Sequence, residues 1–288
     1  MDILGKRKIW YSFSSALIVI GLIFLIFQGL NFGIDFLGGT LLEFGFDTQV
    51  SNEEARSIIE ELGYEEIVVR QIVEDEIQGV LISMQELDPE EMVKIENAFQ
   101  AEYPSIEVLR TTMIGPAIGR ELMIYSLWAL LLASIAIIIY VSVRFEFRFA
   151  IVAIITLLHD VLITIGLFAL LGREVNTAFV AALLTILGYS INDTIVIFDR
   201  IRENMKLYRN KPFIEQANTA VVDTLPRSIN TSMTTLLAIL AMYLFGGPEL
   251  QTFMLALFIG MAAGTYSSIF VASPLLVTWQ EKFSPAKR

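Results

Sequence analysis

The stretch Leu187-Gly-Tyr-Ser-Ile-Asn-Asp-Thr-Ile-Val-Ile-Phe-Asp-Arg200 places an acidic residue late in a segment that is otherwise apolar. The acid is Asp193, and small or hydroxyl side chains surround it in the sequence. A carboxylate in a hydrocarbon environment is unfavourable unless a partner, water or a proton compensates its charge. Asp193 is therefore a candidate functional residue of a membrane protein.

The composition indicates the same class of protein. The mean hydropathy is +0.64, and 55% of the 288 residues are hydrophobic whereas 18% are charged, which departs from ordinary soluble domains. Segments of about 20 apolar residues can cross the hydrocarbon core of a bilayer. We therefore predict a polytopic α-helical membrane protein with six transmembrane helices, at Ile9–Phe27, Leu122–Val143, Phe149–Leu171, Ala178–Phe198, Ile229–Phe245 and Phe253–Trp279.

Basic residues predict the orientation of these helices, because cytoplasmic loops carry an excess of Lys and Arg. The basic clusters fall before the first segment and after each pair of crossings, so all would lie on one side. They are Lys6, Arg7, Lys8, Arg144, Arg148, Arg200, Arg202, Lys206, Arg209, Lys211, Lys282, Lys287 and Arg288. We expect both termini in the cytoplasm.

Acidic residues gather in one extramembrane region. Between Asn31 and Gly115 there are 19 acidic and 4 basic residues, so this region carries the negative net charge of the chain. Such a domain argues against nucleic-acid binding, which needs a basic surface. The simplest interpretation of these acidic residues is that they form a solvated surface.

The acidic region has a regular pattern of strands and helices. Ser51 is a suitable cap for one helix, and Asp88 with Pro89 opens another. The expected order is β-α-β-β-α-β, which predicts an α+β ferredoxin-like extracytoplasmic domain between the first and second transmembrane helices. The elements are strand Thr40–Phe46, helix Asn52–Leu62, strands Glu66–Ile72 and Gly79–Met84, helix Pro89–Tyr103 and strand Ile106–Thr111.

The sequence contains few signals for enzyme chemistry. It has no cysteine and a single histidine, His159, so zinc sites and Cys/His nucleophiles cannot be assembled in the usual way. No metal or organic cofactor is expected, and we expect no enzyme activity. The glycine-rich Gly33–Thr40 lacks the Gly-Lys-Ser/Thr ending of a phosphate loop. We interpret it as a structural exit from the first helix, in which the notable residues are Gly33, Asp35, Gly38 and Gly39.

These patterns divide the chain into four parts. Residues 1–30 form the cytoplasmic N-terminus and the first transmembrane helix, and residues 31–118 form the outer domain. Residues 119–280 form a bundle of five transmembrane helices, and residues 281–288 form a cytoplasmic tail.

Four stretches also resemble the SecF family, which belongs to the SecD/SecF complex of bacterial protein export and is related to RND transporters. They are Gly33–Thr40, Ile114–Gly119, Gly188–Asn204 and Arg227–Gly247. The resemblance implies a non-enzymatic subunit that uses the proton motive force to promote late stages of preprotein translocation and release. It also implies SecD, the SecYEG channel and an unfolded preprotein as partners, within the lipid of the cytoplasmic (inner) membrane of a bacterium.

The resemblance further implies a proton pathway through Asp193 and Arg227. Arginine stays charged, whereas a carboxylate can take up and release a proton. Because the fourth helix runs inward and the fifth runs outward, we expect these two residues to approach each other near the inner ends of their helices. The coupling ion implied is H⁺, with Na⁺ as an alternative.

Further polar residues lie along the same helices. His159 and Asp160, midway along the third segment, could join a proton relay or could serve only to fix helix packing. Asn192, Thr194 and Asn230 are candidates for relay or support, although small polar residues in membranes also hydrogen-bond neighbouring helices.

Two other functions are alternatives to protein export. One is half of an RND-type small-molecule efflux transporter, although an outer region of about 85 residues is small for a drug pocket. The other is a passive membrane scaffold, for which neutralising Asp193 would change assembly at most.

Overall fold

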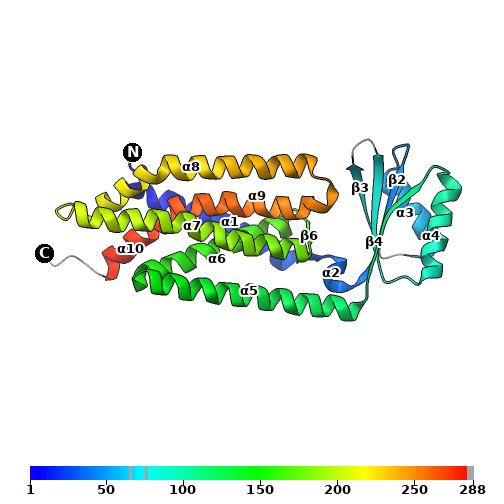
Figure 1. Cartoon of the computed structure of the whole chain (residues 1–288), viewed down its shortest axis with the longest axis horizontal. Coiled ribbons are helices and arrows are strands. Elements are labelled where there is room, and N and C mark those ends of the chain that lie inside the picture. The colour runs from blue at the N-terminus through cyan, green and yellow to red at the C-terminus, as the bar shows by residue number, and fades with distance from the viewer. Residues whose placement is uncertain (65–66, 75–76, 284–288) are drawn as a thin grey trace.

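The computed structural model describes residues 1–64, 67–74 and 77–283. Figure 1 shows an elongated molecule with a bundle of long helices at one end and a sheet with two helices at the other. The N-terminus and the last helix, α10 (Ser273–Phe283), lie at the end of the bundle farthest from the sheet.

The described residues contain six helical segments that are long and apolar enough to cross a membrane. This result confirms the six predicted segments. The sixth consists of α9, a π-helical turn at Ser268–Ala272 and α10. The others, in chain order, are α1 (Arg7–Phe27), α5 (Pro116–Arg144), α6 (Phe147–Leu170), α7 (Thr177–Leu207) and α8 (Phe213–Phe245), and α9 spans Pro248–Ser267.

Two helix boundaries differ from the prediction by more than the others. Helix α7 continues beyond Phe198 to Leu207, and α8 begins at Phe213 instead of near Ile229. The two extensions carry opposite charges and pair, as Arg200 Nη2 donates to Asp223 Oδ2 at 2.6 Å. Hydropathy cannot detect such polar extensions. Arg227 consequently lies well inside α8 and does not begin it.

Close packing holds the bundle together. Helices α1 and α6 cross at Gly21 and Gly166, where an added Cβ would lie less than 3 Å from the partner backbone. Small residues allow such close approach between membrane helices. Helix α7 packs against α6, α8 and α9, which places the residues around Asp193 at the centre of the bundle.

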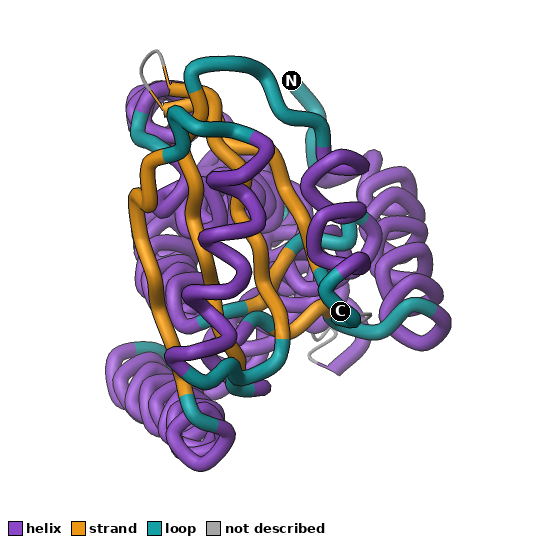
Figure 2. The backbone as a smooth tube through the Cα atoms, turned by 90° about the vertical axis from the view of Figure 1, so that its right-hand side faces the viewer, coloured by secondary structure: helices purple, strands orange, loops and turns teal. Residues whose placement is uncertain are grey.

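The outer domain has the predicted order of elements. It contains β2 (Gly39–Phe46), α3 (Asn52–Glu61), β3 (Val68–Glu74), β4 (Ile77–Met84), α4 (Pro89–Glu102) and β5 (Glu107–Ile114). The strands form one antiparallel sheet in the order β3-β4-β2-β5. Figure 2 looks onto this sheet with its helices in front. Glu66, the first residue of one predicted strand, lies outside the described residues.

Local hydrogen bonds fix the start of α3. Glu54 N donates to Ser51 Oγ at 3.2 Å, and Ser51 N donates to Glu54 Oε2 at 2.8 Å. This reciprocal pair is a capping box, so the predicted cap at Ser51 is confirmed. The backbone N–H of Ser51, followed by its side chain, holds the pKa of the Glu54 carboxyl below its usual value.

Short elements connect the outer domain to the bundle. After α1, the two-residue strand β1 (Asn31–Phe32) pairs in parallel with β6 (Glu174–Val175), which precedes α7. The single-turn helix α2 (Ile34–Leu37) follows β1 and leads into β2. These elements are too short to give a periodic sequence signal, and the sequence analysis did not predict them.

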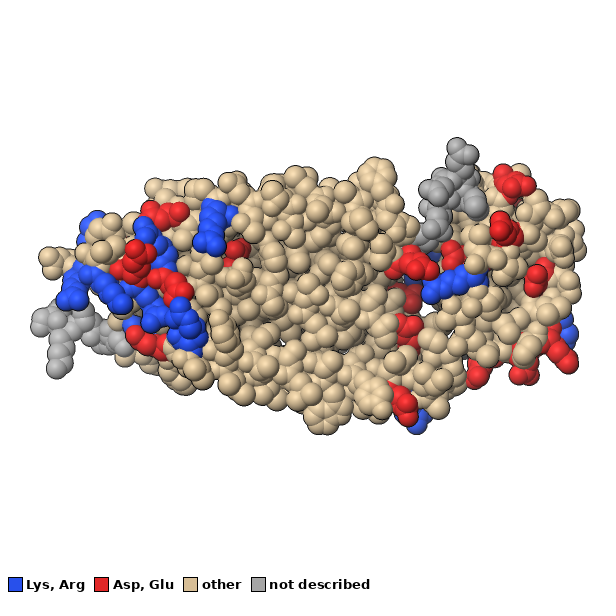
Figure 3. Space-filling model, viewed as in Figure 1, with Lys and Arg blue, Asp and Glu red and all other residues tan. Residues whose placement is uncertain are grey.

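Charged side chains gather at the two ends of the molecule. In Figure 3 a broad surface without Lys, Arg, Asp or Glu covers the middle of the bundle. Basic and acidic side chains mix at the end near α10, whereas acidic side chains predominate over the outer domain. The uncharged middle is the part of the surface suited to contact with lipid hydrocarbon.

Candidate intramembrane site

Asp193 lies on α7 and is buried, with 7% of its surface exposed. Its side chain faces Ser228 of α8. The Ser228 hydroxyl is close enough to interact with the Asp193 carboxyl, but among the described residues neither Asp193 Oδ2 nor Ser228 Oγ makes a hydrogen bond of normal length and angle. Buried polar atoms are usually paired, so this carboxylate oxygen is available to bind a proton, an ion or water.

Arg227 lies one residue before Ser228, and its side chain is exposed. It is close enough to Asp193 for a Coulombic attraction, but no ion pair joins the two in the described part of the chain. Arg227 instead lines an open crevice of about 310 Å³ between α7 and α8, together with Val196, Asp199, Arg200, Glu203 and Thr224. The two residues are therefore neighbours that do not pair directly, and the proton pathway through them stays a prediction.

A second buried acid, Asp160 of α6, has three side-chain hydrogen-bond partners. His159 Nδ1 lies 2.8 Å from Asp160 Oδ1. Ser190 of α7 and Ser267 of α9 donate to Asp160 Oδ2 at 2.5 and 2.9 Å. All four side chains are buried, and Asp160 is only 1% exposed. This group, named here the Asp160 cluster, joins three helices.

The Asp160 cluster also contacts α1 through aromatic residues. The His159 ring stacks against that of Tyr266, with centroids 6.2 Å apart. Tyr266 Oη donates to Trp10 O at 3.1 Å and lies 3.2 Å from Ser14 Oγ. His159 Nε2 has no partner among the described residues. The sequence alternatives of relay and packing both stay open for His159.

The other predicted support residues fall into two groups. Thr194 is buried, and its Oγ1 lies 2.9 Å from Ser268 Oγ in the π-helical turn. Asn192 and Asn230 have exposed side chains on the surface of the bundle. The structure therefore brings Thr194 into the interior and leaves the two asparagines outside it.

The serines that complete these contacts, Ser190, Ser267 and Ser268, were not among the residues predicted from the sequence. A signal was present for Ser268, because Gly260, Gly264 and Ser268 recur every four residues. Such a spacing of small residues indicates a close helix contact in membranes.

The glycine-rich turn connects α1 to both the outer domain and α7. Asp35 Oδ2 accepts from the backbone N–H of Thr177 at 2.9 Å and from its hydroxyl at 2.5 Å, which satisfies the first backbone amide of α7. Gly38 and Gly39 have φ values of 80° and 139°, which disfavour side chains. A Cβ on Gly33 would meet the Glu174 side chain at 2.1 Å. The predicted structural role of this turn is consistent with these contacts.

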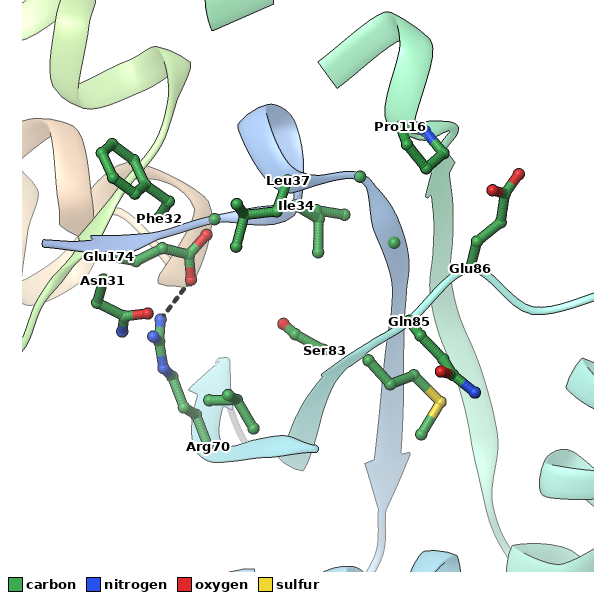
Figure 4. A pocket seen from close by; sticks show the side chains of 15 residues that line it. Asn31, Phe32, Ile34, Leu37, Arg70, Ser83, Gln85, Glu86, Pro116 and Glu174 are labelled. Atoms are coloured by element: carbon green, nitrogen blue, oxygen red, sulfur yellow. Dashed lines mark hydrogen bonds and ion pairs between the residues drawn. The ribbon is translucent and has the colours of Figure 1, made fainter. Parts of the chain in front are cut away.

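Ion pairs connect the outer domain to the bundle. Arg70 of β3 pairs with Glu174, which precedes α7, at 2.7 Å, and Arg110 of β5 pairs with Glu249 of α9. Figure 4 shows the first pair at the edge of a pocket of about 330 Å³. We refer to these two ion pairs as the outer junction. In residues 1–64, 67–74 and 77–283, no group of His, Cys, Asp and Glu is suited to hold a metal ion.

Two family profiles match the chain. The profile described as protein export membrane protein SecD/SecF, C-terminal, matches residues 94–282. The profile of the SecD/SecF GG motif matches residues 23–50, which include the glycine-rich turn.

Curated relatives carry related names. The chain is 41% identical over 300 residues to protein translocase subunit SecF of Thermobaculum terrenum, and the match covers 98% of this chain and 95% of that protein. It is 39% identical to SecF of Haemophilus influenzae, covering 94% and 83%. With protein translocase subunit SecDF of Thermus thermophilus it shares 41% identity, covering 88% of this chain and 35% of that protein.

Solved structures agree with these relatives. The crystal structure of SecDF from Thermus thermophilus, a translocon-associated membrane protein, superposes with a TM-score of 0.90 at 38% identity and covers 98% of this chain and 39% of that chain. SecDF in its super-membrane-facing form gives a TM-score of 0.72 at the same identity and coverage. The profile over residues 94–282 and the near full-length SecF relatives show that the chain belongs to the SecF family of protein translocase subunits.

Proposed function

We propose that this accessory subunit of the Sec translocase uses the proton motive force to promote late stages of preprotein translocation, with Asp193 as the proton carrier. The observation that supports this role most strongly is that the buried Asp193 Oδ2 makes no hydrogen bond of normal length and angle with the described residues. A carboxylate in this position exchanges a proton with little rearrangement of its neighbours. Arg227, in the adjacent crevice, supplies a permanent positive charge.

The proposal includes partners. The relatives named SecDF are longer than this chain, which supports pairing with SecD. A single helix bundle leaves one side of the proposed proton pathway uncovered. The exposed α8 side chains of Arg227, Asn230 and Thr231 lie on a surface that the helix bundle of SecD could cover. We infer that SecYEG and an unfolded preprotein complete the assembly, without a chemical reaction and without a cofactor other than the coupling ion.

The proposal also includes an orientation. The ferredoxin-like outer domain, residues 31–118, would be extracytoplasmic, with both termini in the cytoplasm. The mixed basic end of the molecule and its acidic outer end (Figure 3) support this orientation. The bundle would comprise residues 119–280, and residues 1–30 and 281–288 would supply the first helix and the tail.

The test is translocation into inverted membrane vesicles that contain this chain and SecD, measured after ATP is exhausted, with and without a proton gradient. We expect Asp193→Asn to abolish the gradient-driven step at normal assembly. Thr185→Val is a matched control, because Thr185 lies exposed on α7 and bonds only its own helix. Unchanged translocation in Asp193→Asn would favour the scaffold or the RND-type efflux half-unit. A sodium gradient in place of the proton gradient distinguishes the two coupling ions.

A further inference from the structure

Helices α7 and α9 contact each other at three successive levels. Gly260 faces Ile186, and an added Cβ would lie 2.2 Å from Ile186 Cδ1. One turn further, Gly264 faces Ser190, where the added Cβ would lie 2.9 Å from Ser190 Cβ. At the third level, Ser268 Oγ lies 2.9 Å from Thr194 Oγ1. Residues four apart lie on one helix face, so these contacts define a single register between α7 and α9.

Asp160 binds both helices at the middle level of this register. One carboxylate oxygen, Oδ2, accepts from Ser190 of α7 and from Ser267 of α9. The other oxygen lies 2.8 Å from His159 Nδ1, which fixes the orientation of the carboxylate. A slip of α7 by one turn would remove Ser190 from Asp160 and Thr194 from Ser268 together.

This register determines where Asp193 points. Asp193 follows Ser190 by three residues and immediately precedes Thr194, so both neighbours share its helical turn. When Ser190 faces α6 and α9, and Thr194 faces the π-helical turn, Asp193 is directed to α8, where it faces Ser228. Rotation of α7 would move the carboxylate away from the crevice that contains Arg227.

Stability alone does not explain why a hydrogen-bonded acid lies between these helices, because apolar side chains can stabilise a helix contact equally well. Interhelical hydrogen bonds in membranes contribute modestly to stability, but they specify which faces meet. Two serine hydroxyls, from α7 and α9, that donate to one buried carboxyl oxygen of α6 therefore indicate a requirement for a particular arrangement of these three helices.

We propose that Asp160 is a positioning residue for Asp193: its bonds to Ser190 and Ser267 fix the rotation and register of α7. The inference rests on the proposed role of Asp193 as proton carrier. Asp160 acts through α7 and makes no direct contact with the coupling ion in this scheme.

The test uses the absence of cysteine from the chain. The pair Thr194→Cys and Ser268→Cys reports on the register, because the native oxygens are within hydrogen-bond distance. The full chain with SecD is oxidised in membranes, and the rate of disulfide formation is compared between backgrounds. We expect Asp160→Ala, and separately Ser190→Ala with Ser267→Ala, to slow disulfide formation about tenfold, since both variants remove buried acceptors or donors.

Two further variants serve as comparisons. Asp160→Asn keeps a carbonyl acceptor for the two serines, so it should restore most of the rate and most of the gradient-driven translocation lost in Asp160→Ala. Thr156→Val is the matched control, because Thr156 is buried on the same helix and bonds only its own Val152 carbonyl. Its rate of disulfide formation should stay within about twofold of wild type, because the near-isosteric change removes no hydrogen bond between helices.

The outcomes separate this inference from the proposed function. Unchanged disulfide formation in Asp160→Ala and in the double serine variant would overturn the positioning role, whatever happens to translocation. Slower disulfide formation with normal translocation would also overturn it, provided that Asp193→Asn has lost the gradient-driven step. If Asp193→Asn retains that step, the proposed function fails, whereas the disulfide rates still report on the bond that Asp160 makes between helices.

Discussion

The Asp160 cluster and the outer junction both join separate parts of the chain through polar side chains, but they differ in solvent. Asp160 is 1% exposed and bonds three neighbours, whereas Arg70 and Glu174 of the outer junction are 33% and 15% exposed. Salt and water weaken charges at a surface and have little effect on a buried cluster. The bundle is thus joined by contacts of fixed geometry, and the outer domain by contacts that conditions can loosen.

The largest effect is expected from Asp160→Ala. The substitution leaves the Ser190 and Ser267 hydroxyls without their acceptor and should lower the free energy of unfolding of the bundle by about 2 kcal/mol, given the modest energy of each interhelical bond. Unfolding by a denaturing detergent, followed by circular dichroism, measures this change. The loss should be the same at low and high salt, and a strong salt dependence would contradict the description of the cluster as buried.

The next largest effect is expected from Asp35→Ala. Asp35 accepts two hydrogen bonds from Thr177 at the start of α7. Loss of a side-chain acceptor for an amide at a helix N-terminus costs about 1 kcal/mol. Hydrogen exchange of the backbone amides in the first turn of α7 should accelerate, while the end of α7 near Leu207 stays protected. In Asp35→Asn an acceptor is kept, so the same amides should exchange almost as slowly as in wild type.

A smaller effect is expected from Arg70→Ala. Exposed ion pairs contribute roughly 0.2–1 kcal/mol, so the variant should broaden the distance distribution between spin labels at Asn97→Cys and Gln251→Cys, which report on the outer domain and on α9. High salt should broaden the wild-type distribution in the same way. Glu60→Gln is the control, since its partner Arg56 lies on the same helix α3. An equal broadening in this control would show that the outer junction does not hold the domain.

The sequence predicted these two regions unequally. Hydropathy and capping signals gave the six membrane segments, the strand and helix order of the outer domain, and the cap at Ser51, because these depend on local pattern. The pairing of Asp160 with Ser190 and Ser267 depends on which faces of three helices meet, and no local pattern encodes that. The outer junction was missed for a similar reason, since Arg70 and Glu174 are distant in sequence and come together only when β1 pairs with β6.

The exposed position of Asn192 shows the same limit from the opposite direction. Asn192 and Thr194 both flank Asp193 in sequence, yet the Asn192 side chain is exposed and that of Thr194 is buried. On a helix, neighbours in sequence point about 100° apart. Proximity in sequence to a functional residue is therefore weaker evidence than a spacing of three or four residues.

The smallest effect is expected from Glu54→Gln, and it separates the outer domain itself from its junction. The pKa of Glu54 is lowered in the folded state by Ser51, so the carboxylate contributes stability above its unfolded pKa. That contribution is lost as the pH falls through the folded pKa, which lies below the ordinary value of 4.5. Hydrogen exchange of α3 should accelerate over this acidic range in wild type and much less in Glu54→Gln, because Gln still accepts from Ser51 N but does not titrate.

Ser57→Ala is the control for this prediction. The Ser57 hydroxyl bonds only the Glu53 carbonyl of the same helix, so the variant should keep the wild-type pH dependence. If hydrogen exchange of α3 accelerates equally at low pH in Glu54→Gln and in wild type, the pH dependence belongs to other carboxylates of the outer domain. The charge of Glu54 would then contribute nothing to the capping box.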